Sequence, residues 1–146
     1  MASVTGKRQV IKAMAVVRRP RDGALLVSEP VSGSDPPFQR PLGGHVEFGE
    51  YALDTVRREF GEEIGQELTD VRLLGVLENI FTLDGIDRHE IVFVFDAQFA
   101  DAEWRARTEF AVNEAACIAP ATWVPLASLG DHGIPVYPRD LVQLLA

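Results

Sequence analysis

The chain has 146 residues, of which 47% are hydrophobic and 25% charged, and its formal net charge is −8. These values are typical of one globular domain that buries a core of its own, and the acidic balance argues against a general nucleic-acid-binding protein. No apolar run approaches the about 20 residues that a transmembrane helix needs, so we expect no membrane partner.

The start of the chain and its cysteine content favour the cytoplasm. Basic residues flank only a short apolar patch near the N-terminus, which lacks the hydrophobic region and cleavage site of a signal peptide. Cys117 is the only cysteine, which excludes an internal disulfide and fits a reducing compartment. We expect Cys117 to be a small buried residue rather than a nucleophile.

The first third of the chain is expected to begin with a hairpin. Residues 10–19 read as a strand, 21–23 as a turn, and 24–28 as the strand that pairs with the first. The run PVSGSDPP at 30–37 is typical of a loop. Gly43 and Gly44 read as a glycine-rich turn that leads into a helix.

The rest of the chain supplies the other expected elements. A helix is predicted over 51–64, followed by strands at 71–81 and 90–99 that are joined by a turn at Asp84 and Gly85. Residues 101–120 read as irregular. A short strand at 122–126 and a helix at 139–145 complete the chain. Because no repeat or linker interrupts these elements, we expect a single domain over 1–146.

The predicted helix at 51–64 carries two distinct flanks. Glu59, Glu62 and Glu63 fall within about 100° of arc on one flank, and an apolar stripe lies on another, made of Leu53, Val56, Phe60 and Ile64. Clustered carboxylates repel one another by about 0.2–0.5 kcal/mol per pair and bind hard cations such as Mg²⁺. A solvated acidic surface is the alternative interpretation.

The segment 44–65, GHVEFGEYALDTVRREFGEEIG, resembles the Nudix box, the signature of the Nudix hydrolases. Its fixed positions are supplied here by Gly44, Glu50, Arg58, Glu59, Glu62, Glu63 and Gly65. Two aliphatic positions of the pattern differ, because Phe60 and Gln66 occupy them. The order of elements is also similar to the Nudix fold, which implies an α+β fold with a mixed β-sheet between helices, an α/β/α sandwich.

The resemblance implies a metal-dependent hydrolase, MutT-like, that cleaves a nucleoside diphosphate linked to another group through water attack on phosphorus. It implies Mg²⁺ or Mn²⁺ as the cofactor, with Glu59 and Glu63 as principal ligands and with Glu62 and the Gly44 carbonyl beside them. Arg58 and Glu50 are expected to orient these ligands. The general base stays open among four residues, which are Glu62, Glu90, Glu109 and Glu114.

The substrate is expected to be a small nucleotide derivative. Candidate substrate-binding residues are Arg40, Phe81 and Glu90, each of which also has a plain structural interpretation. No proline follows the box before Pro120, unlike in ADP-ribose hydrolases, and no tyrosine follows where dinucleoside polyphosphate hydrolases place one. The short chain favours a nucleoside tri- or diphosphate-type substrate over nucleotide sugars. A nucleotide sensor without catalysis is the alternative, and a homodimer stays open.

Overall fold

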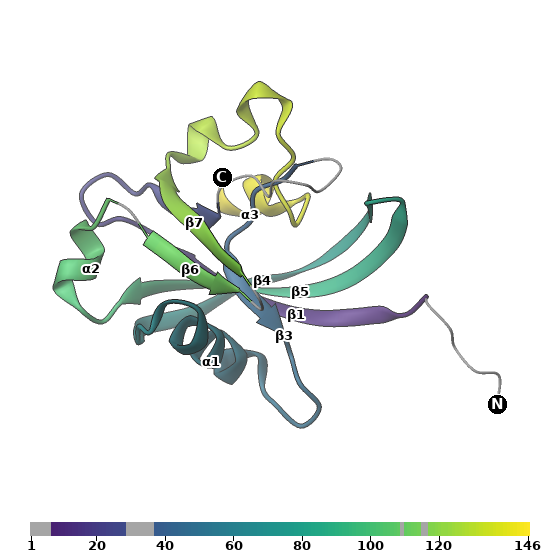
Figure 1. The fold of residues 1–146 in the computed structure, drawn as a ribbon, viewed down its shortest axis with the longest axis horizontal. Coiled ribbons are helices and arrows are strands. Elements are labelled where there is room, and N and C mark those ends of the chain that lie inside the picture. Colours follow the sequence, from purple (N-terminus) through teal and green to yellow (C-terminus); the bar gives the residue numbers. More distant parts are fainter. Residues whose placement is uncertain (1–6, 29–36, 109, 115–116) are drawn as a thin grey trace.

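The structure is a computed structural model, and it describes residues 7–28, 37–108, 110–114 and 117–146, with the backbone alone for 110–114, 117–120 and 132 (Figure 1). The strands are β1 Gln9–Val17, β2 Leu25–Ser28, β3 Leu42–His45, β4 Leu68–Leu83, β5 Ile86–Phe99, β6 Phe110–Glu114 and β7 Cys117–Val124. The helices are α1 Ala52–Ile64, α2 Ala102–Ala106 and α3 Leu141–Leu145, with 3₁₀ turns at Leu126–Ser128 and Asp131–Gly133.

The described strands form two sheets. The large sheet has the order β3-β1-β5-β4, and the small sheet has the order β2-β7-β6. The large sheet is mixed, because β1 runs parallel to β5 while the β1–β3 and β4–β5 pairs are antiparallel. Asp84 and Gly85, with φ of 53° and 75°, form the predicted two-residue turn between β4 and β5. The expected α+β class with a mixed sheet is confirmed.

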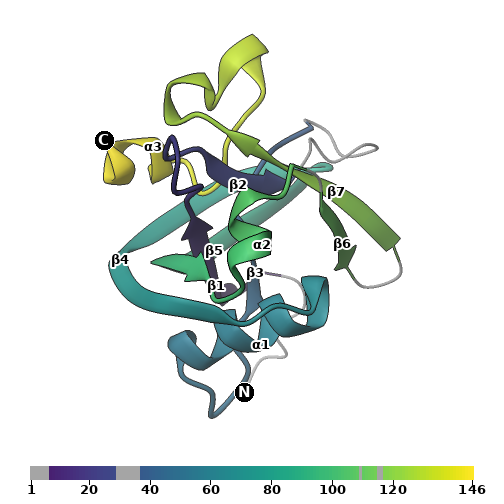
Figure 2. The same ribbon diagram turned by 90° about the vertical axis from the view of Figure 1, so that its left-hand side faces the viewer.

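The large sheet buries apolar side chains on both of its faces, as alternation along β1 requires. Ala13, Ala15 and Val17 join a core that includes α1, and we call this side the α1 face. Met14 and Val16 join a second core that includes Leu141 of α3, and we call this side the α3 face. Figure 2 shows α1 and α3 on opposite sides of the large sheet. The sheet therefore lies between helices, as predicted.

Helix α1 forms where the sequence predicts it. Val56, Phe60 and Ile64 are buried at helical spacing against the α1 face. The helix ends at Gly65, which adopts the left-handed conformation (φ 67°) and donates its N–H to the Gly61 carbonyl. The apolar stripe therefore fixes the rotation of the helix, and its acidic flank points away from the core.

The predicted pairing of residues 24–28 with the first strand is wrong. Strand β2 pairs with β7 in the small sheet, and only a single bridge, Arg18 with Leu25, joins it to the end of β1. All four residues of β2 are buried. A strand that is apolar on both faces can cross to a second sheet, where both faces are covered, rather than fold back as a hairpin.

Gly43 and Gly44 lie in strand β3 and not in a turn, which is a second difference from the prediction. They pair with Met14 and Ala13 of β1. A Cβ on Gly43 would lie 2.1 Å from the Ala13 carbonyl oxygen. These glycines therefore serve close approach between the backbone and its neighbours, which is a use that glycine has in strands as well as in turns.

The segment 101–120 is not irregular throughout, because it contains α2, β6 and the start of β7. The expected strand at 122–126 is the end of β7, and the C-terminal helix begins two residues later than expected. Most of the predicted loop 30–37 lies outside the described residues, as does the side chain of Cys117. No helix in the described part of the chain is long and apolar enough to cross a membrane.

Candidate active site

Arg58 connects the acidic flank of α1 to the segment before the helix. Its guanidinium binds the Glu50 carboxylate through two hydrogen bonds, from Nε to Oε2 at 2.8 Å and from Nη2 to Oε1 at 2.9 Å. Nη1 donates to Glu59 Oε1 at 2.9 Å and to Glu62 Oε2 at 3.3 Å, and Nη2 donates to the His45 carbonyl at 3.1 Å. One cation thus contacts three carboxylates and the end of β3.

Glu50 and Arg58 form a pair that is charged at neutral pH. The Arg58 hydrogen bonds, followed by one from the Thr55 hydroxyl, lower the pKa of Glu50 to about 2. The same contact with Glu50 is the main cause that raises the pKa of Arg58 above its usual value. Glu50 is therefore ionised at neutral pH and engages Arg58 through both carboxylate oxygens.

Gly44 brings strand β3 against the carboxylate of Glu59. A Cβ at this position would lie 2.4 Å from Glu59 Cδ and 2.5 Å from its Oε1. Any side chain larger than hydrogen would displace the carboxylate. Strand β3 and the acidic flank of the helix therefore lie together because residue 44 is glycine.

The predicted catalytic and metal-binding residues other than Glu50 line one cavity of about 500 Å³. Among its lining residues are Arg40, Gly44, Arg58, Glu59, Glu62 and Glu63. Glu63 is buried (7% exposed), whereas the Glu62 side chain is 61% exposed. Glu50 lies behind Arg58 instead of in the cavity. The structure therefore brings together the residues of the box that the sequence nominated.

The donors around this cavity suit a hard divalent cation. Glu59, Glu62 and Glu63 offer carboxylate oxygens, and Gly44 lines the same cavity. In the described part of the chain no three acidic, histidine or cysteine side chains converge into a closed metal cage. Arg58 contacts both Glu59 and Glu62 instead, so the two carboxylates already carry a counter-charge.

Lys12 lies in the same cavity and was not among the predicted site residues. Its Nζ lies 2.8 Å from Glu90 Oε2, and the two side chains are 18% and 5% exposed. Burial lowers the pKa of Lys12, and the charge of Glu90 opposes this effect. One feature of the sequence could have identified Lys12 as a site residue: it is a lysine inside the apolar run VIKAMAVV. A charged side chain is not expected among residues that face a core.

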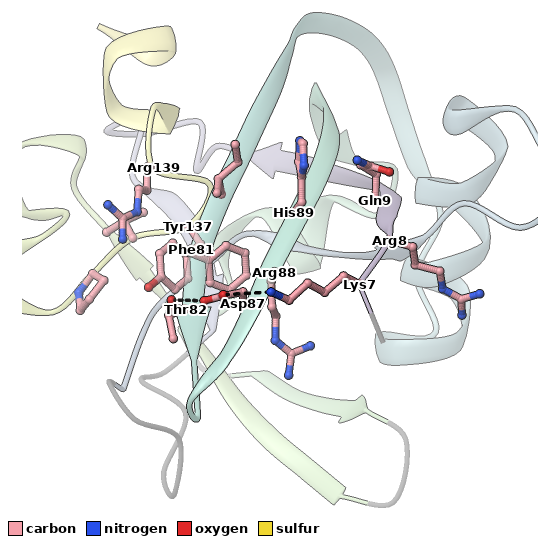
Figure 3. Close-up of a pocket in the computed structure, with 13 residues that line it drawn as sticks. Lys7, Arg8, Gln9, Phe81, Thr82, Asp87, Arg88, His89, Tyr137 and Arg139 are labelled. Atoms are coloured by element: carbon pink, nitrogen blue, oxygen red, sulfur yellow. Dashed lines mark hydrogen bonds and ion pairs between the residues drawn. The ribbon is translucent and has the colours of Figure 1, made fainter. Parts of the chain in front are cut away.

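The other candidates have different positions. Glu90 is buried and bound to Lys12, and it lies opposite Asn79 in the β4–β5 pair. Phe81 does not line the cavity but stacks on Tyr137, with ring centroids 4.5 Å apart. Both aromatic residues line a second, larger groove of about 1040 Å³ (Figure 3). Glu109 and the side chain of Glu114 lie outside the described residues.

Comparisons with known proteins agree with the fold. The family model described as NUDIX domain matches residues 8–145. A MutT protein from Methanosarcina mazei Go1 is 24% identical, covering 96% of this chain and 94% of its own, with a TM-score of 0.64. A MutT NUDIX hydrolase from Burkholderia pseudomallei is 22% identical, with coverages of 95% and 98% and a TM-score of 0.59. A C. elegans Ap4A hydrolase is 15% identical, with coverages of 93% and 94% and a TM-score of 0.61. No curated protein matches the sequence.

Proposed function

The chain belongs to the Nudix family, whose members hydrolyse pyrophosphate bonds of nucleoside diphosphate derivatives, and from this premise we propose that it is a metal-dependent hydrolase of a nucleoside diphosphate linked to another group. The observation that carries the proposal is the cavity beside α1, which combines carboxylates oriented by Arg58 with the cations Lys12 and Arg40. Acidic and basic side chains in one cavity suit a diphosphate that arrives with a divalent cation.

Glu59, Glu63, Glu62 and the Gly44 carbonyl would hold Mg²⁺ or Mn²⁺. When bound, such an ion neutralises charge on the diphosphate and lowers the pKa of water. Arg58 keeps the carboxylates of Glu59 and Glu62 in place, and Glu50 keeps Arg58 in place. Supports of this kind orient ligands at metal sites generally.

Lys12 and Arg40 would bind phosphate oxygens of the substrate. Phosphoryl transfer asks the protein mainly to position its groups and to stabilise charge, and cations in the cavity do both. Glu90 fixes the Lys12 ammonium at 2.8 Å, which supports a positioning role for Glu90.

Glu62 is the general base that the geometry supports best. Its side chain is 61% exposed, lines the cavity, and contacts only Arg58 at 3.3 Å or more among described residues. It can therefore reach a water molecule that approaches the diphosphate.

A phosphate-release screen coupled to pyrophosphatase and phosphatase tests the function. The compounds are nucleoside triphosphates, dinucleoside polyphosphates, ADP-ribose, nucleotide sugars, NADH and coenzyme A, because MutT proteins and an Ap4A hydrolase share this fold. We expect turnover of one class with Mg²⁺ or Mn²⁺ and none in EDTA. Nucleotide binding without turnover under every condition would instead identify a sensor.

A further inference from the structure

A small cavity of about 190 Å³ lies between α2 and the turn that joins β1 to β2, and we call it the arginine cavity. The described residues that line it are Arg19, Pro20, Arg21, Arg105, Ala106 and Thr108. None of them lines the box cavity, which is the cavity of about 500 Å³ beside α1. Figure 1 shows α2 and the β1–β2 turn on the same side of the molecule. The function proposed above does not account for this cavity.

Positive charge gathers in the arginine cavity although the chain as a whole is acidic. Three of its lining residues are arginines, and none of the described ones is acidic. Arg19 is neutralised by Asp22, whose two carboxylate oxygens accept hydrogen bonds from Nε and Nη2 of Arg19. Arg21 and Arg105 form no ion pair within the described part of the chain. Two positive charges at one concave surface therefore have no bound counter-charge.

Both walls of the arginine cavity are held in place by contacts with strands. The Nε of Arg105 donates to the Phe99 carbonyl of β5 at 2.7 Å, which leaves the outer amino groups of this guanidinium available. Trp123 of β7 contacts both walls, because the Arg19 guanidinium lies 5.7 Å from its ring centroid and its Nε1 donates to the Arg107 carbonyl. The walls are thus positioned before a ligand binds, which lowers the cost of ordering them.

The volume and the donors of the arginine cavity define the chemical class of its ligand. Sites that enclose a whole small molecule have about 300–1,000 Å³, so a cavity of about 190 Å³ admits one small group. Guanidinium groups bind phosphate oxygens through charge-assisted hydrogen bonds, and Thr108 adds a hydroxyl to the same lining. A phosphate group carries a charge of about −1.5 to −2 at neutral pH, which matches the charges of Arg21 and Arg105.

We propose that the arginine cavity is a binding site for a phosphate group, which is either inorganic phosphate or the phosphate end of a larger molecule. Arg21 and Arg105 bind the phosphate oxygens, while Arg19 holds the turn in position through Asp22 and Trp123. The site is separate from the box cavity, because the two share no lining residue. The proposal therefore does not rest on the function proposed above.

An NMR titration with inorganic phosphate, in EDTA and at constant ionic strength, tests the proposal. The backbone amides of Ala106 and Thr108 report on the cavity, because both residues line it. We expect their resonances to shift and to saturate at about millimolar phosphate, which is the affinity that two charge-assisted contacts provide. Chloride should not shift them.

A second titration with AMP distinguishes the two sources of the phosphate group. If a larger molecule supplies it, AMP shifts the same resonances with at least the affinity of inorganic phosphate. If AMP binds more weakly than inorganic phosphate, the site is assigned to the free anion. Either result supports a phosphate site, whereas no saturating shift with either probe overturns it.

Arg21→Ala and Arg105→Ala should each weaken phosphate binding about tenfold, which is the effect of losing one charge-assisted contact. Arg105→Ala also removes the hydrogen bond to Phe99 and can weaken the fold. Arg21 is exposed and donates no side-chain hydrogen bond within the described part of the chain, so Arg21→Ala tests the site with the fold retained.

The matched control is Arg88→Ala, which removes an exposed arginine from the larger groove, where Arg8 and Arg139 also lie. It should leave the phosphate titration of the arginine cavity unchanged. Wild-type phosphate affinity in Arg21→Ala, or an equal loss of affinity in Arg88→Ala and Arg21→Ala, would overturn the proposal.

Discussion

Replacing Gly44 with alanine should lower turnover about 100-fold while leaving the fold intact. The new Cβ would lie 2.4–2.7 Å from three atoms of the Glu59 carboxylate, whereas ordinary contact begins at 3.4 Å. The carboxylate must therefore retreat by about 1 Å, and a displacement of this size at a reacting centre costs about 100-fold in rate. The atoms in the way belong to the end of a flexible side chain, so stability should fall by only about 1 kcal/mol.

Two other glycines provide matched controls for Gly44→Ala. In Gly43→Ala the Cβ would meet the Ala13 carbonyl oxygen at 2.1 Å, and because backbone cannot move aside, we expect a loss of about 3 kcal/mol or more. In Gly61→Ala the Cβ would meet nothing within 4 Å, and alanine is favoured in a helix by about 0.5–1 kcal/mol. Gly61→Ala should therefore gain stability and keep wild-type turnover.

The assay pairs urea unfolding, followed by circular dichroism, with turnover of the substrate found in the phosphate-release screen. The expected pattern is a loss of rate in Gly44→Ala, a loss of fold in Gly43→Ala and neither in Gly61→Ala. Wild-type turnover in Gly44→Ala would refute the argument that this glycine places Glu59. Equal destabilisation of Gly43→Ala and Gly44→Ala would refute the distinction between backbone and side-chain neighbours.

Three further predictions concern charged side chains. Glu63→Gln should lower turnover by orders of magnitude with the fold retained, while Glu103→Gln in α2 should not; comparable kcat values would argue against a ligand role. Since the pKa of Glu50 is about 2 when folded against an ordinary 4.5, its contribution to stability is complete above pH 4.5 and lost as pH falls toward 2. The urea midpoint of Glu50→Gln should thus lie below wild type at pH 7, and this gap should close in acid; a constant gap contradicts the pairing. Lys12→Met or Glu90→Gln alone should cost about 3 kcal/mol and the double variant less than either, whereas additive losses in denaturant would show that the pair is not coupled.

Most of the architecture could be predicted where local patterns are strong. The apolar stripe of α1 and the long alternating runs of β4 and β5 carry enough periodicity to identify each element without its neighbours. Strand β3 escaped prediction because LGGH has no strand pattern, and its two glycines are explained only by the atoms of Ala13 and Glu59 that lie against them. The partner of β2 depends on a strand about 90 residues later in the chain, which no local pattern shows.

The candidate site also has one part that the sequence could predict and another part that it could not. The box residues could be named from their spacing, because Glu50, Arg58 and the three glutamates lie within one helix and the turn before it. Lys12 lies on strand β1, and only the register of the large sheet brings it near the box. A sequence motif describes residues that are close along the chain, whereas the rest of a site is assembled by strand pairing.

The box cavity and the groove are built by different segments of the chain. The acidic side chains come from α1, while the groove arginines come from the start of β1, the tip of the β4–β5 hairpin and the segment 135–139. Mutations in the hairpin tip can therefore change the groove without moving the carboxylates. During evolution, or in a chimaera that receives the hairpin tip of a relative, the groove and the box cavity can change independently of each other.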